Sequence, residues 1–174
     1  GSAHNVGGFV GHDGYDGSSI SNAYATGSVS GTGNNVGGFV GSNDDGAITS
    51  AYATGSVSGT GNNVGGFVGY NDHGTITNAH ATGNVSGQLI VGGLVGANGS
   101  LLGAEKVGGF DTGIITNSYA TGSVTGGNYD YIGVSKLGGL VGANTGTITN
   151  AFVTGNVLGG HANALQNLCS RCML

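Results

Sequence analysis

Short apolar runs alternate with polar, glycine-rich segments along the whole chain. The run Val36-Gly-Gly-Phe-Val-Gly41 is bounded by Gly, Asn and Asp and is too short for a helix, so it predicts a buried strand. After a turn, residues 47–49 (Ala-Ile-Thr) predict a second strand. From Tyr24 to Ser30, small or apolar residues alternate with hydroxyl-bearing ones, which predicts a third strand with its hydroxyls facing water.

The same unit recurs five times. Its most regular piece is Tyr-Ala-Thr-Gly or a close variant, which starts at Tyr24, Tyr52, His80, Tyr119 and Phe152. The first three starts are evenly spaced, and the last two intervals are longer. A period of about 28 residues is typical of solenoids, in which each unit buries its apolar face against its neighbours. The sequence therefore predicts an all-β fold, a β-solenoid of about five coils over residues 1–160, with short strands and turns of Gly, Asn and Asp.

Equivalent positions of the units define columns of side chains. The column that we expect in the core comprises Ile20, Ile48, Ile76, Ile115 and Ile148. A mostly asparagine column suits a corner where side-chain amides stack and hydrogen-bond between coils, and it comprises Asn22, Ser50, Asn78, Asn117 and Asn150. The turns before the second strand, such as residues 43–46 (Asn-Asp-Asp-Gly), contain residues that tolerate positive φ.

Two insertions interrupt the period, near residues 99–113 and 127–136. Insertions into a solenoid form surface loops, where binding often occurs. In the second insertion Tyr129 and Tyr131 flank Asp130, and exposed rings beside a carboxylate are suited to contact a sugar. The alternative is a longer corner whose rings pack on the coil.

Residues 161–174 differ from the repeats and predict a C-terminal capping or docking tail. Ala162, Leu165, Cys169 and Cys172 recur at helical spacing, and such a segment can cover the open end of a solenoid or dock on a neighbouring molecule. Cys169 and Cys172 are a possible disulfide, and an intermolecular bridge and two free thiols are the alternatives. The pair lacks the further ligands of a zinc site and the His of a haem attachment site.

The sequence offers little for catalysis or metal binding. It contains no Gly-x-Ser-x-Gly elbow, and a chain with 6% charged residues has few groups that could perturb a pKa in a cleft, so we expect no enzyme and no cofactor. Carboxylates recur in the turns, at Asp13, Asp44 and Asp72 for example. They match neither the nine-residue calcium repeat nor an EF-hand, so we interpret them as turn residues and predict no metal site; the alternative is an edge of carboxylates, one per coil, that holds a hard cation such as Ca²⁺.

Composition narrows the range of partners. The chain has 41 Gly, no Pro and a formal net charge of −5. Because it has no basic surface, we expect no binding to nucleic acid or to anionic membranes. Because no apolar run reaches about 18 residues, we expect no membrane insertion.

Two segments carry a resemblance to a known family: Val91-Gly-Gly-Leu-Val-Gly-Ala-Asn98 and Leu137-Gly-Gly-Leu-Val-Gly-Ala-Asn144. Each is followed in its unit by Ile-Thr-Asn and then by the tetrapeptide described above. This pattern covers most of residues 5–160 and resembles the GLUG-motif repeat of bacterial surface adhesins, hemagglutinin-like passengers and regions flanking IgA-cleaving metallopeptidases. The resemblance implies an extracellular or cell-surface β-solenoid. It transfers no catalytic residue, and the His-Glu-x-x-His signature of the metallopeptidase is absent from this sequence.

Three functional classes follow from these observations. The first is a structural or adhesive module that stacks end to end with copies of itself. The second is a binder of ice or of an extended surface glycan, through a hydroxyl face comprising Thr26, Thr54, Thr82, Thr121, Thr154, Ser28, Ser56 and Ser123. Thr has a high strand propensity and stabilises sheets through pairs across strands, so rows of Thr do not by themselves establish binding. The third, an enzyme fragment, rests only on the association of the motif with peptidases.

Overall fold

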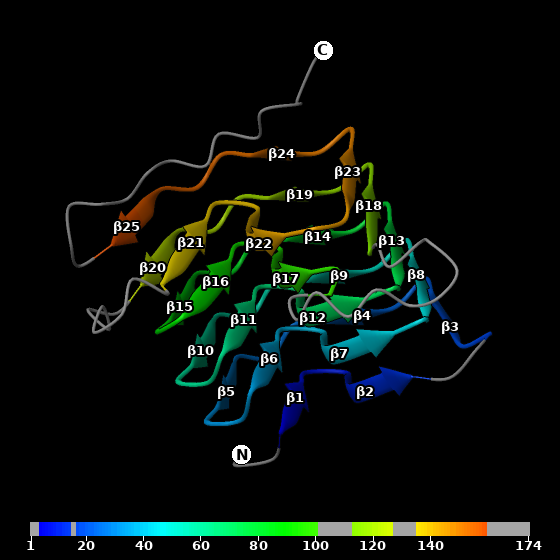
Figure 1. The fold of residues 1–174 in the computed structure, drawn as a ribbon, viewed down its shortest axis with the longest axis horizontal. Helices are drawn as coiled ribbons and strands as arrows, with labels where there is room; N and C mark the ends of the chain where they lie inside the picture. Colours follow the sequence, from blue (N-terminus) through cyan, green and yellow to red (C-terminus); the bar gives the residue numbers. More distant parts are fainter. Residues whose placement is uncertain (1–3, 15–16, 101–112, 127–134, 160–174) are drawn as a thin grey trace.

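The computed structural model describes residues 4–14, 17–100, 113–126 and 135–159, which wind into a β-solenoid with no helix among them (Figure 1). The strands form five parallel sheets, and each sheet takes one strand from each of the five units. The predicted all-β solenoid is therefore confirmed. The described residues contain no helix that is long and apolar enough to cross a membrane.

The first sheet holds β1 (Asn5–Gly7), β6 (Asn35–Gly37), β11 (Asn63–Gly65), β16 (Ile90–Gly92) and β21 (Lys136–Gly138). The second holds β2 (Val10–Gly14), β7 (Val40–Asp44), β12 (Val68–Asp72), β17 (Val95–Asn98) and β22 (Val141–Asn144). The third holds β3 (Ser19–Ser21), β8 (Ala47–Thr49), β13 (Thr75–Thr77), β18 (Ile114–Thr116) and β23 (Thr147–Thr149).

The fourth sheet holds β4 (Tyr24–Ala25), β9 (Tyr52–Ala53), β14 (His80–Ala81), β19 (Tyr119–Ala120) and β24 (Phe152–Val153). The fifth holds β5 (Val29–Gly31), β10 (Val57–Gly59), β15 (Val85–Gly87), β20 (Val124–Gly126) and β25 (Val157–Gly159). Equivalent residues of successive units are Cα partners across the coils. Val85 still pairs with Val124 across the longest interval between units, so the first insertion does not shift the register.

Each coil contains five strands, whereas the sequence predicted three. The expected first strand bends at residues 38–39 and becomes β6 and β7. A Cβ added at Gly37 would lie 1.9 Å from the Val40 carbonyl oxygen, so this bend requires glycine. The expected third strand is likewise divided into two strands by residues 26–28.

The core consists of apolar columns that run through the coils. Phe39 and Phe67 stack with ring centroids 4.9 Å apart and are fully buried, as are the middle residues of the predicted isoleucine column. A second cluster, whose buried members are all valine, lies between the first and fifth sheets and includes Val36, Val64 and Val91. The predicted core is therefore confirmed.

The predicted asparagine column lies at a corner, and one pair of its members makes the expected amide hydrogen bond between coils. These residues have positive φ, between 49° and 54°, at the turn between the third and fourth sheets. Asn tolerates this left-handed conformation, which explains its preference there. Their side chains are exposed, and Asn150 Nδ2 donates to Asn117 Oδ1 over 3.1 Å. The buried amide bonds between coils are formed elsewhere, as described next.

Candidate functional site

Buried asparagines form a ladder at the end of the second sheet. Asn43, Asn71 and Asn98 are each 0% exposed, and each Nδ2 donates to the Oδ1 of the next asparagine over 2.7–2.8 Å, as far as Asn144. Each Nδ2 also donates to the carbonyl oxygen of the glycine just before the strand of the third sheet. Asn71 Nδ2, for example, donates to the Gly74 carbonyl oxygen at 2.9 Å. The ladder joins coils two to five by side-chain hydrogen bonds.

A second, shorter ladder lies on the first sheet. Asn63 Nδ2 donates to Asn35 Oδ1, and Asn35 Nδ2 donates to Asn5 Oδ1, both over 2.8 Å. It ends where Ile90 replaces asparagine in the fourth coil. Both ladders stabilise the stack by joining successive coils.

The predicted threonine column lies on the surface beside the fourth sheet. All five members are exposed: Thr26, Thr54, Thr82, Thr121 and Thr154. The amide of each of the last four donates to the alanine carbonyl oxygen of the preceding coil over 3.0–3.1 Å, which holds the threonines in line. The column therefore presents a row of hydroxyl and methyl groups to solvent.

The predicted serine positions lie two residues farther along the chain. Ser28 and Ser56 are exposed, whereas Ser123 is half-buried and its amide donates to Asn84 Oδ1 at 3.0 Å. A groove of about 340 Å³ runs between this row and a further row of polar residues on the fifth sheet, two positions later in each coil. Its lining includes Ser30, Ser58, Ser86 and Thr125, and no charged residue contributes to it.

A column of stacked rings adjoins the threonine column. It comprises Tyr24, Tyr52, His80, Tyr119 and Phe152, with successive ring centroids 4.8–5.2 Å apart and planes within 8° of parallel. Because each ring covers the face of the next, the column presents ring edges to solvent along its length, and free faces are found only at Tyr24 and Phe152 (59% and 56% exposed). Burial lowers the pKa of His80 below its ordinary value.

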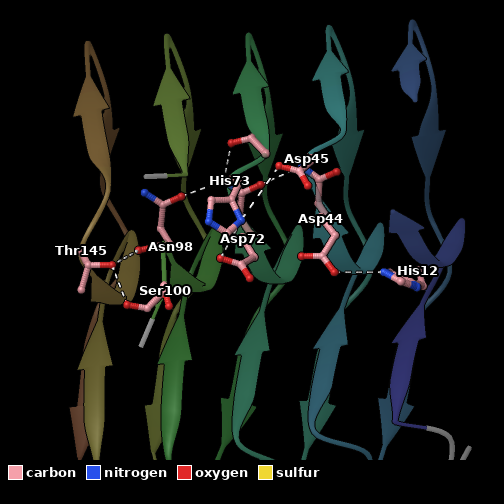
Figure 2. Close-up of polar contacts among 11 residues, drawn as sticks. His12, Asp44, Asp45, Asp72, His73, Asn98, Ser100 and Thr145 are labelled. Atoms are coloured by element: carbon pink, nitrogen blue, oxygen red, sulfur yellow. Dashed lines mark hydrogen bonds and ion pairs between the residues drawn. The ribbon is translucent and has the colours of Figure 1, made fainter. Parts of the chain in front are cut away.

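Acidic and histidine side chains line the edge where the second sheet ends, as Figure 2 shows. His12 Nε2 lies 3.4 Å from Asp44 Oδ2, and His73 Nδ1 lies 3.2 Å from Asp72 Oδ1 and 4.0 Å from Asp45 Oδ1. The ligand atoms of Asp44, Asp72 and His73 lie within 4.8 Å of one another, so these three side chains could hold a metal ion. The contacts with histidine give the carboxylates a structural role that needs no metal ion.

The turn prediction is confirmed in part. Asp45 and His73 have positive φ (61° and 57°), as expected of turn residues. The asparagines that precede them, Asn43 and Asn71, are extended, buried members of the ladder instead.

Several predicted positions lie outside the described residues. They are the loop residues Tyr129, Asp130 and Tyr131, the tail 161–174, and the possible disulfide of Cys169 and Cys172. Of the two insertions, only residues 99–100, 113 and 135–136 lie inside.

Sequence reasoning missed both amide ladders and the ring stack. The first ladder had a signal, because Asn follows Val-Gly-x in four units, as in residues 40–43 and 141–144. The ring stack also had one, because an aromatic residue or histidine stands two residues before every column threonine. These repeated side chains contact one another only because equivalent strands of successive coils pair in parallel and in register.

Comparison with known families agrees with this architecture. The family model described as the GLUG motif matches residues 2–30, 32–58, 60–86 and 133–158, more than half of the chain. The matches coincide with the first, second, third and fifth coils. The fourth coil lies outside them, although its strands pair in register with both neighbours. No curated protein matches the chain.

Proposed function

Since the chain belongs to the GLUG-motif family, we propose that it is an extracellular, non-enzymatic structural module that stacks end to end with copies of itself. The observation that carries this proposal is that both end coils leave their core columns open. Phe9 is 53% exposed at one end, whereas Phe39, which stacks on it, is fully buried. At the other end Val157 is 39% exposed, whereas its Cα partner Val124 is fully buried.

A second copy placed head to tail would continue each column with a residue of the same kind. Phe152 of one molecule would meet Tyr24 of the next in the ring column, and Val157 would meet Val29. The end strands β1–β5 and β21–β25 also have no partner strand on one side among the described residues. An in-register stack would supply their missing backbone hydrogen bonds. Because the two contacting surfaces differ, the contact repeats along one direction and produces a fibre.

A pair of substitutions in the last coil tests this proposal. Val153→Lys places a charge in the open core column, because Val153 is 41% exposed and follows Ala25, Ala53, Ala81 and Ala120 in that column. Thr154→Lys adds the same charge at the next residue, on the outer face. We expect fibres of the unmodified chain and of Thr154→Lys in electron micrographs, and single particles for Val153→Lys with an unchanged strand spectrum by circular dichroism. Fibres of equal length for both variants would contradict the proposal.

The hydroxyl face favours a second candidate function, binding of ice or of an extended glycan. The supporting observation is the unbroken exposed threonine column beside an uncharged groove. A surface without charge suits a neutral polysaccharide rather than an acidic one.

Replacing Thr54 and Thr82 together by Tyr tests the second candidate, because Tyr keeps the strand preference and covers the row. Replacing Thr49 and Thr77 by Tyr in the same two coils, on the third sheet, is the matched control. We expect the first pair alone to abolish ice shaping or co-sedimentation with an insoluble neutral polysaccharide. Equal activity of both pairs would remove the face from consideration.

A further inference from the structure

The buried asparagine ladder has a direction. From Asn43 through Asn71 and Asn98 to Asn144, the Nδ2 of one coil donates to the Oδ1 of the next coil. Each Nδ2 also donates to a glycine carbonyl oxygen of its own coil, so the amides cannot turn over without setting oxygen against oxygen. Every coil in the ladder therefore offers an acceptor to the coil before it and a donor to the coil after it.

Asn144 offers its donor at the open face of the last coil. Its Oδ1 accepts from Asn98 Nδ2 over 2.8 Å, and its Nδ2 donates to the Gly146 carbonyl oxygen over 3.0 Å. The second N–H of Asn98 donates to the next coil, whereas the second N–H of Asn144 has no partner among the described residues. Asn98 is 0% exposed and Asn144 is exposed, because a further coil covers only Asn98.

Asp13 offers an acceptor at the open face of the first coil. It occupies the ladder position of that coil, since its Cα partner on β7 is Asn43. A Cβ added at Gly46 would lie 2.7 Å from Asp13 Oδ2, and at Gly113 the equivalent neighbour is Asn71 Nδ2 at 2.6 Å. Oδ2 therefore takes the place of the amide nitrogen. Oδ1 takes the place of the amide oxygen, which in the later coils accepts from the coil before.

We infer that Asn144 of one molecule donates to Asp13 Oδ1 of the next molecule, and that this pair selects the faces that meet in the stack. The inference rests on the end-to-end stacking proposed above and adds the contact that makes it specific. A bond to a carboxylate is charge-assisted and stronger than a bond between neutral groups. Two like faces would bring donor to donor or acceptor to acceptor, so only a head-to-tail contact completes the ladder.

The same pair would set the register of the joint. A slip of two residues would keep the backbone hydrogen bonds and the inward side of each strand, but it would separate Asn144 from Asp13. The shorter ladder on the first sheet cannot do this. It begins at Asn5, whose Oδ1 is already used by Asn35, and the equivalent residue in the last coil is Lys136, which can only donate.

An exchange of the two side chains tests the contact. Asn144→Asp sets two carboxylates against each other at the joint. Adding Asp13→Asn restores one donor and one acceptor in reversed order, because the side of position 13 that faces Asn43 already holds an oxygen. Thr147→Asp, at an exposed position of the same coil on the third sheet, is the matched control for the added charge. Sedimentation equilibrium measures association, and circular dichroism verifies the strand content.

We expect Asn144→Asp to weaken association at least about tenfold, because it removes a bond to a charged acceptor and adds repulsion. The double variant Asp13→Asn/Asn144→Asp should return to within about threefold of the unmodified chain, as should Thr147→Asp. Asp13→Asn should bring no comparable gain when it is combined with Thr147→Asp, because there it relieves no direct contact.

The outcomes separate this inference from the stacking proposal. If the unmodified chain associates, equal association of Asn144→Asp and Thr147→Asp would overturn the inference and leave stacking in place. A folded double variant that associates as weakly as Asn144→Asp would also overturn it. An unmodified chain that stays a monomer at every concentration would contradict the stacking proposal and the inference together.

Discussion

Removal of one amide from the middle of the buried ladder gives the sharpest test of what holds the coils together. Asn71 is 0% exposed and makes three side-chain bonds: it accepts from Asn43 Nδ2, and it donates to Asn98 Oδ1 and to the Gly74 carbonyl oxygen. Asn71→Ala therefore removes the partner of one Asn43 Nδ2–H and of Asn98 Oδ1, both of which are buried, whereas the Gly74 carbonyl oxygen keeps its bond from the Ile114 amide.

Each buried polar group that loses its partner costs about 1–3 kcal/mol, and the groups of one network are not additive. Because two groups lose a partner, we expect Asn71→Ala to lower the free energy of unfolding by about 2–6 kcal/mol, a large part of the stability of a typical domain. Asn62→Ala, at an exposed position of the same coil, removes the same atoms and should change it by less than about 0.5 kcal/mol.

Urea unfolding followed by circular dichroism measures both variants, with the slope compared between them to check that the same surface unfolds. A loss below about 1 kcal/mol for Asn71→Ala, or equal losses for the two variants, would refute the claim that the ladder stabilises the stack.

Three further predictions concern the core, a glycine and the ring stack. Phe67→Asp should prevent folding, because it buries an unpaired charge in a fully buried column; a soluble protein with the native strand spectrum would contradict the core assignment. Gly66→Ala should cost about 1–3 kcal/mol in urea unfolding, because its Cβ would lie 2.1 Å from the Gly93 carbonyl oxygen, and no loss would mean that the coils can separate there. Because burial lowers the pKa of His80, the unfolded chain binds more protons than the folded chain, and the free energy of unfolding falls as the pH drops below about 6.5. His80→Tyr should therefore become more stable than the unmodified chain towards pH 5. Parallel curves of stability against pH for the two proteins would refute this.

The coil and its core could be predicted because they depend on repeated positions. Once a unit recurs with a regular period and its strands pair in parallel, residues such as Ile48 and Ile76 must stack, and strand alternation places Thr54 and Thr82 outside. The number of strands could not be predicted, because the bend at residues 38–39 depends on a close backbone approach that hydrophobic periodicity does not encode.

The buried ladder was missed for a related reason. Asn43 comes after the strand predicted from residues 36–41, and asparagine is typical of exposed turns, so the sequence indicated a turn where the structure has a buried position inside β7. Burial became favourable only because Asn71 and the Gly46 carbonyl oxygen supply partners for its amide.

The mass of the full chain in solution, followed by light scattering as its concentration rises, tests end-to-end stacking most directly. If the open coils contact one another, the mass increases through whole multiples of 16.7 kDa, and a chain that ends at Gly160 shows whether the tail promotes or blocks the contact. A constant mass of one chain at every concentration, for both versions and with an intact strand spectrum, would contradict the account.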